Sequence, residues 1–181
     1  MRLRPRRQRV IALLALVAGG LLYAHFHRFY GGPLVHPGGA HIGAPVRIGK
    51  PFVMADIGVD NDGGSRVTLD AVHFGHEFPG TSVHVWVVTA GNHERSDGTS
   101  FPPPGIALSD LHQIEGFHIA GHTRNVQLAA EITATRPGCV GFQGMTIDYT
   151  TGFLHYRRTS DDPIFDGATP GVPIRNCTKF S

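Results

Sequence analysis

The feature that most constrains this chain is a basic N-terminus followed at once by an uncharged apolar run. Five arginines lie within the first nine residues, and no charged residue then occurs from Val10 to Phe26. That run has about 17 residues, or roughly 25 Å as a helix, near the lower limit for crossing a bilayer. Its end is rich in aromatic residues of the kind that settle at a membrane interface, namely Tyr23, Phe26, Phe29 and Tyr30.

The arginines also predict an orientation, because basic flanks stay on the cytoplasmic side of a membrane. We therefore expect a basic cytoplasmic tail (1–9), a transmembrane signal anchor (10–30) and everything later outside the cytoplasm. The predicted location is the cell membrane, in a single pass, with the lipid bilayer as a partner. A cleaved signal peptide is the alternative, and Ala18-Gly19-Gly20 would be its best cleavage site. No cysteine stands directly after the apolar run, which excludes a lipoprotein anchor.

Charge outside the anchor argues against nucleic acid as a partner. Six of the 16 Lys and Arg residues precede Gly31, whereas all 14 Asp and Glu residues follow it. The part beyond the anchor is thus mildly acidic, while a nucleic-acid surface needs clustered positive charge on the domain itself.

The rest of the chain reads as a linker and then a β domain. Gly and Pro are dense in residues 31–45, which predicts a linker leaving the membrane. Residues 46–181 are predicted to form one extracytoplasmic domain. Alternating or continuous apolar runs within it predict strands at Pro51–Asn61, Arg66–Phe74, Ser82–Thr89, Asn125–Ala134, Val140–Tyr149, Phe153–Arg158 and Val172–Cys177.

Turn signals between these runs predict how some of them pair. Asp62-Gly63-Gly64-Ser65 suggests a hairpin between the first two strands, and Thr150-Thr151-Gly152 suggests another later in the chain. Seven or eight short strands with no helix-length amphipathic pattern after residue 31 are typical of an all-β, antiparallel sandwich. The expected fold is this sandwich preceded by one N-terminal transmembrane helix.

One stretch of sequence carries a resemblance. Residues 137–156 read PGCVGFQGMTIDYTTGFLHY, and they stand between the basic anchor and the C-terminal predicted strand. This layout resembles that of membrane-anchored bacterial proteins with an immunoglobulin-like extracytoplasmic domain. The resemblance implies an immunoglobulin-like β-sandwich, and it brings no catalytic motif to transfer.

Cys139 and Cys177 are the two cysteines of the chain. Outside the cytoplasm two thiols in a small domain usually pair, so we expect a disulfide that ties the C-terminal strand to the sandwich. A redox role would need a C-x-x-C motif or an activated thiolate, and neither is visible. A blue-copper site would need a histidine between Cys139 and Met145, and none is there.

Histidine is unusually frequent, with 12 in the chain. The densest group, His73, His76 and Glu77 with His84 nearby, offers zinc or copper ligands. Residues three apart on a strand face opposite sides, so His73 and His76 converge only if Gly75 bends the chain. We therefore expect no metal site and keep these four residues as an alternative.

Enzyme signatures are absent from the sequence. It contains no G-x-S-x-G, phosphate loop, H-E-x-x-H or S-x-x-K motif. We expect no catalytic residues and no cofactor, although the fold could still assemble a catalytic triad. The favoured function is a membrane-anchored binding or scaffolding domain with another envelope protein as partner. The alternative is a histidine-based accessory protein that binds copper or zinc in the cell envelope.

Overall fold

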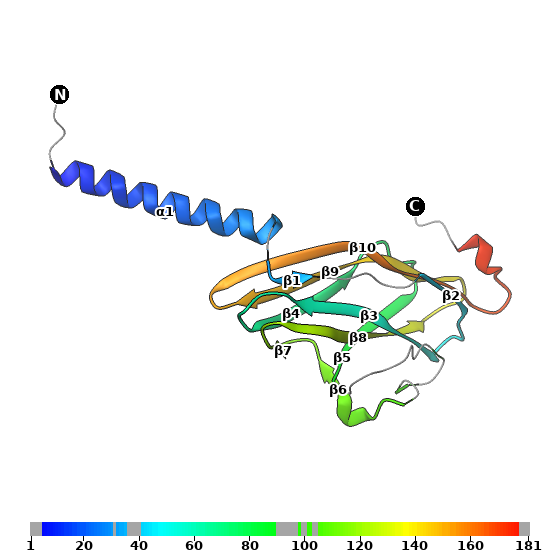
Figure 1. Ribbon diagram of the computed structural model, residues 1–181. Coiled ribbons are helices and arrows are strands. Elements are labelled where there is room, and N and C mark those ends of the chain that lie inside the picture. Colours follow the sequence, from blue (N-terminus) through cyan, green and yellow to red (C-terminus); the bar gives the residue numbers. More distant parts are fainter. Residues whose placement is uncertain are drawn as a thin grey trace.

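The computed structural model is mostly β-sheet, with one long N-terminal helix (Figure 1). It describes residues 5–30, 32–35, 41–89, 98, 101–102 and 105–177, with the side chains of all of these except 5–9, 24–30 and 56. The elements are α1 (Pro5–Tyr30), β1 (Leu34–Val35), β2 (His41–Pro45), β3 (Pro51–Asn61), β4 (Val67–Phe74), β5 (Thr81–Val88), η1 (Leu108–Asp110), β6 (Leu111–Gln113), β7 (His118–Ile119), β8 (Thr123–Ala134), β9 (Cys139–Thr151), β10 (Leu154–Ala168) and η2 (Ile174–Asn176).

The strands form two five-stranded sheets with the order β1-β3-β8-β5-β6 in one and β2-β10-β9-β4-β7 in the other. Successive long strands change sheet between β3 and β4, β4 and β5, and β8 and β9, whereas β9 and β10 form a hairpin. The six long strands can be given the letters B to G in chain order, namely β3, β4, β5, β8, β9 and β10. One sheet then contains the order B-E-D and the other contains the order G-F-C. This is the strand order of an immunoglobulin-like sandwich.

The core lies between the two sheets because each strand turns alternate side chains inward. Leu128, Ala130 and Ile132 of β8 are fully buried there. They face a set of aromatic rings from the other sheet, in which Phe142 lies 4.1 Å from Phe74 and 6.4 Å from Phe165, between ring centroids. A smaller apolar cluster covers the outer face of β5, where Trp86 and Val88 meet Ile106 and Leu111. Both faces of β5 are therefore covered, as its continuous apolar run predicts.

Most of the strand predictions are confirmed. The first predicted strand coincides with β3, and the second through sixth correspond to β4, β5, β8, β9 and β10. The β9–β10 hairpin is also confirmed, with Thr151 opposite Leu154 across its turn.

Three expectations differ from the structure. The predicted hairpin between β3 and β4 is wrong, because β3 pairs with β8 and β4 with β9 in the opposite sheet. The segment 31–45, predicted as a linker, contributes β1 to one sheet and β2 to the other. The final predicted strand, Val172–Cys177, is a turn containing the short 3₁₀ helix η2.

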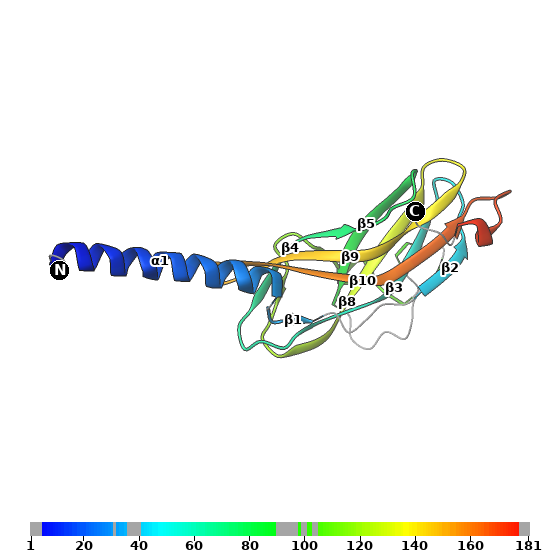
Figure 2. The ribbon, with the colours of Figure 1, turned by 90° about the horizontal axis from the view of Figure 1, so that it is seen from above.

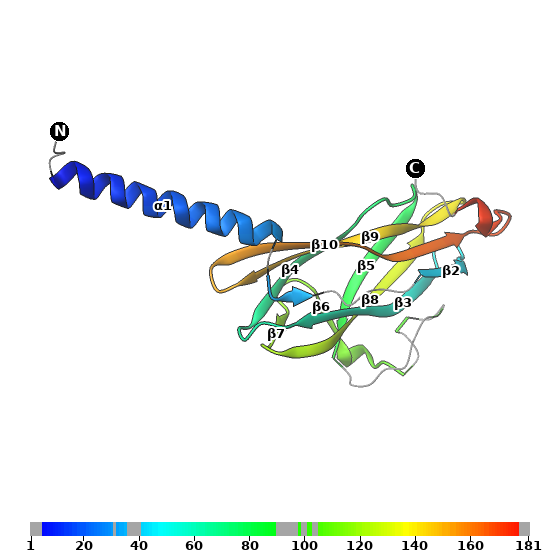
Figure 3. The same ribbon diagram turned by 45° about the horizontal axis from the view of Figure 1, so that its top comes forward.

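Helix α1 projects from one end of the sandwich (Figure 3). Every described side chain from Val10 to Tyr23 is exposed, and Leu16 is 74% exposed. No helix in the described part of the chain is both long enough and apolar enough to cross a membrane.

The junction between α1 and the sandwich is short and closely packed. A Cβ on Gly32 would overlap the hydroxyl of Tyr149, so the chain passes directly over that phenol. Leu34, two residues later, is fully buried. The amide of Asp62 then donates a hydrogen bond of 2.9 Å to the carbonyl of Pro33, which ties the junction to the β3–β4 turn. We call this end of the sandwich, with the β3–β4 turn at 62–66, the helix-side end.

Candidate functional site

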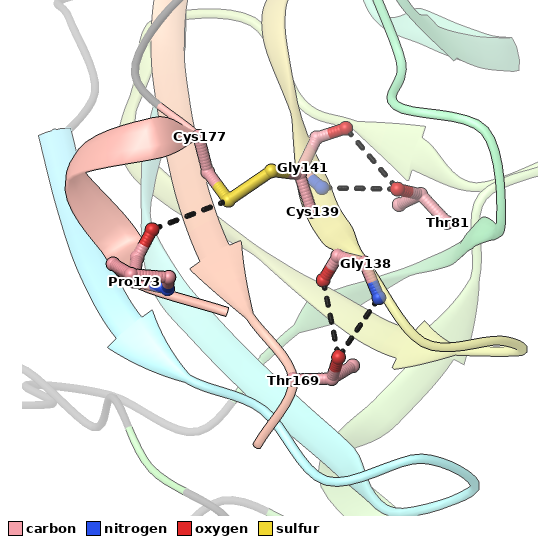
Figure 4. Close-up of a disulfide and its surroundings, with 7 residues drawn as sticks. All are labelled: Thr81, Gly138, Cys139, Gly141, Thr169, Pro173 and Cys177. Atoms are coloured by element: carbon pink, nitrogen blue, oxygen red, sulfur yellow. Dashed lines mark hydrogen bonds between the residues drawn. A yellow bond between two sulfur atoms is a disulfide. The ribbon is translucent and has the colours of Figure 1, made fainter. Parts of the chain in front are cut away.

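Figure 4 shows the disulfide between Cys139 and Cys177. Cys177 directly follows η2, which lies at the end of the sandwich opposite the helix (Figure 1). Cys139 begins β9, Cys177 follows η2, and their sulfur atoms are 2.12 Å apart with a Cα–Cα distance of 5.3 Å. The cysteine pair that the sequence predicts is therefore joined in the structure. Because Cys177 is fully buried, the bridge fixes the last described segment of the chain against the sheet.

Hydrogen bonds reinforce this fixed segment. Thr169 at the end of β10 is 1% exposed, and its hydroxyl accepts from the amide of Gly138 at 2.8 Å. Within the segment, the amide of Cys177 donates to the carbonyl of Ile174 at 2.7 Å, which closes the turn of η2. The turn from Pro170 to Cys177 thus has a defined position against β2 and β10.

An apolar cleft of about 640 Å³ opens between this turn and the start of β3. Its walls are mainly proline and aliphatic side chains with one aromatic ring. The lining residues are Pro45, Val46, Arg47, Lys50, Pro51, Phe52, Ala168, Thr169, Pro170, Gly171, Val172 and Ile174. The volume is within the range usual for ligand-binding clefts, and nothing in the sequence pattern pointed to it.

The charge around the cleft is positive. Arg47 and Lys50 are both exposed on its rim, and the lining contains no acidic side chain. Neither cation forms an ion pair with any residue that the structure describes. An apolar interior with two exposed cations at its edge suits an apolar group that carries a negative charge.

A second hollow, of about 390 Å³, lies at the open side of the sandwich between β4 and β5. It brings together three of the four residues considered as alternative metal ligands, with His73 from β4, Glu77 from the following loop and His84 from β5. His76 is not among its lining residues. The backbone at His76 is in the left-handed region, at φ 44°, so the chain does bend beside Gly75.

These four residues nevertheless do not form a metal-binding group. No cluster of three or more His, Cys, Asp or Glu side chains with metal-ligand geometry occurs among the described residues. His73 instead faces Asp148 on the outer sheet surface, with Nε2 3.4 Å from Oδ2. His84 packs its ring against Trp86, at 4.5 Å between centroids.

Ionisable groups near the helix-side end have shifted pKa values. Arg157 holds Asp148 with two hydrogen bonds of 2.7 and 2.8 Å, and this contact lowers the pKa of the Asp148 carboxyl. Burial raises the pKa of Tyr149 to about 12, although the backbone of Leu34 acts in the opposite direction. The shift of Asp148 favours the folded arrangement at neutral pH, where Tyr149 keeps its proton in either state, and neither shift marks a catalytic acid or base.

The fold and its bridge thus define the class of protein, an immunoglobulin-like β-sandwich with a disulfide at one end and a helix at the other. No protein family matches the chain, and no curated protein matches it either. Among solved structures, the chain is similar to the ASH/PapD-like domain of human CEP192 (PapD-like domain 7), at 7% sequence identity with a TM-score of 0.42. That similarity covers 78% of this chain and 87% of the other.

Proposed function

We propose that this protein is a membrane-anchored binding domain of the cell envelope, and that its binding site is the apolar cleft beside the disulfide. The cleft itself is the observation that carries the proposal. It combines an apolar lining with Arg47 and Lys50, two cations that have no ion-pair partner among the described residues. The occupant that fits this chemistry is a short apolar segment of another envelope protein that carries a carboxylate.

The anchor in this proposal rests on the sequence together with the exposed surface of α1. Large apolar side chains exposed along a helix that leaves the domain need a cover, and lipid is the one that the preceding arginines favour. The described side chains of α1 end at Tyr23, whereas the uncharged run reaches Phe26. With the arginines in the cytoplasm, the sandwich would lie outside it, in a compartment where its disulfide persists.

A photo-crosslinking amino acid in place of Val172 tests the proposed site. Val172 is half-buried in the wall of the cleft, so a probe there would touch an occupant without replacing a core side chain. Irradiation of native membranes should give an adduct of defined mass. The same probe in place of Leu108, which is 65% exposed on η1 outside the cleft, should give none.

Charge reversal supplies the second arm of the test. Because the rim cations would face a carboxylate, R47E and K50E should reduce the adduct from position 172 while leaving the fold intact. Equal crosslinking from positions 172 and 108, or an adduct that ignores both charge reversals, would reject the cleft as the binding site.

A further inference from the structure

The tip of the β9–β10 hairpin carries the most exposed large apolar side chain among the described residues. Phe153 is 90% exposed, and it follows Gly152, whose backbone at φ 60° makes the tight turn. A single exposed aromatic ring is unremarkable by itself. The position of Phe153 relative to α1, however, indicates a function.

Hydrogen bonds place the hairpin tip and the helix junction at the same end of the sandwich. The hydroxyl of Thr151, beside the tip, donates to the carbonyl of Arg66 at 3.1 Å. The carbonyl of Pro33, beside the junction, accepts from the amide of Asp62 at 2.9 Å. Asp62 and Arg66 bound the same β3–β4 turn. Figures 1 and 2 show the hairpin extending from the sandwich toward the side on which α1 leaves it.

The helix also packs against the hairpin. Helix α1 contacts β10, and Tyr23 lies close enough to Tyr156 to add to the effect of burial in raising the pKa of Tyr156. Tyr156 is three positions along the chain from Phe153 at the tip, which is about 10 Å of extended strand. Phe153 is therefore about 10 Å of strand away from the residue that Tyr23 approaches, and Tyr23 is the first aromatic residue at the outer end of the apolar run.

We propose that the β9–β10 tip is a second membrane-contacting element, and that Phe153 enters the interface of the bilayer that holds α1. This inference rests on the proposed anchoring of α1. A phenyl ring with no polar handle gains free energy by leaving water for the lipid interface, where aromatic side chains gather. Arg66 is exposed at the same end, and it suits the anionic head groups found at membrane surfaces.

Two contacts with one membrane would fix the orientation of the sandwich. The helix alone would give the domain one contact with the membrane, whereas the helix and the hairpin tip together would give it two and so define how the domain stands. The apolar cleft lies at the opposite end of the sheets, beside the disulfide. The contact of Phe153 with lipid would therefore point the cleft away from the membrane, toward partners in the envelope.

Tryptophan fluorescence of the full chain in lipid vesicles tests this contact. Trp86 is the single tryptophan, so F153W in a W86F background reports on the hairpin tip alone. Vesicles containing phosphatidylglycerol and a phosphatidylcholine brominated near the head group serve as the quencher. We expect F153W to show blue-shifted emission and a loss of intensity with the brominated lipid. L108W in the same background should keep water-exposed emission and full intensity.

The controls separate this inference from the proposed anchor. Should W86F fail to fold, F153W is measured with Trp86 retained and the emission of the parent chain is subtracted. Flotation of the protein with vesicles reports on the anchor independently of the probe. If the protein floats with the vesicles but the emission of F153W is unquenched and typical of water, the hairpin does not contact the membrane although the anchor stands. Failure to float would overturn the anchor and this inference with it.

Discussion

The carboxylate of Asp166 on β10 lies 2.7 Å from the Nε2 of His41 on the parallel neighbour β2. The side chain of Asp166 is 3% exposed, whereas the imidazole is 61% exposed. The second carboxylate oxygen, Oδ1, is buried and has no hydrogen-bond partner in the described structure. His41 is therefore the side chain that compensates a buried acidic group under the edge of the sheet.

Replacing that histidine should destabilise the fold. H41A leaves the carboxylate of Asp166 buried without its partner, which we expect to lower the free energy of unfolding by about 1–3 kcal/mol. Urea denaturation of the full chain in detergent measures the change. The double variant H41A/D166N should recover part of the loss, because an amide carries no charge to compensate. Equal stability of H41A and the parent chain would show that solvent compensates the carboxylate instead.

Removing the disulfide should lower the free energy of unfolding more than H41A does. The bridge closes a loop of 38 residues in sequence separation, for which chain entropy gives roughly 3–4 kcal/mol. We expect C139A/C177A to unfold at a correspondingly lower urea concentration. It should also lose crosslinking from position 172, because the turn that the variant frees forms a wall of the cleft.

The unreduced, unfolded parent chain should show no thiol that reacts with a labelling reagent, and two reactive thiols would contradict the bridge.

The helix junction should be intolerant of even a methyl group. A Cβ at Gly32 would collide with the hydroxyl of Tyr149, so G32A must displace either the ring or the chain leaving α1. We expect a loss of about 1–3 kcal/mol in stability. The matched control is G20A, because a Cβ at Gly20 meets nothing within 4 Å and alanine favours a helix. Similar stabilities for the two variants would mean that the junction adjusts freely.

Much of the fold could be predicted from local patterns, as could the β9–β10 hairpin, while the pairing of strands distant in the sequence could not. The alternation in Asn125–Ala134 gave the buried face of β8 directly, since Leu128, Ala130 and Ile132 all face the core. The cluster Asp62-Gly63-Gly64-Ser65 makes the same tight turn whether the chain returns in one sheet or crosses to the other. Here the side-chain amide of Asn61, at the end of β3, donates to the carbonyls of Ile119 in β7 and of Ala120 just after it, which belong to the opposite sheet and its edge. Contacts that distant along the chain leave no local signal.

The candidate site was predictable only where it depends on cysteine chemistry. The pairing of Cys139 with Cys177 followed from their number and expected compartment. The cleft could not be predicted, because its walls come from three separate segments of ordinary residue types. Val46, Phe52 and Val172 represent these segments. Histidine abundance left a metal centre as an alternative only, and no group of three or more metal ligands occurs among the described residues, although three of the four candidates line one hollow.

Stability should fall in alkaline solution through Tyr149. Its pKa is about 12 in the folded chain against an ordinary value of 10.0, so the folded state retains a proton that the unfolded state loses. The resulting stabilisation is complete below pH 10 and disappears as the pH rises through 12, by roughly 2–3 kcal/mol. Urea midpoints measured between pH 9 and 12 follow this change. In Y149F the free energy of unfolding should fall less as the pH rises, and an unchanged fall would show that other groups cause it.

The last prediction concerns the orientation of the chain in the membrane. The arginines between Arg2 and Arg9 should hold the N-terminus in the cytoplasm and leave the C-terminus outside. A protease added to spheroplasts should therefore remove a C-terminal epitope tag while a cytoplasmic marker stays intact. Exchanging the five arginines for serine and placing arginines after Tyr30 should protect the tag, because the basic flank then lies on the other side of the apolar run. Protection of the tag in the parent chain would reject this orientation, and a soluble mature form beginning near Leu21 would show a cleaved signal peptide instead of an anchor.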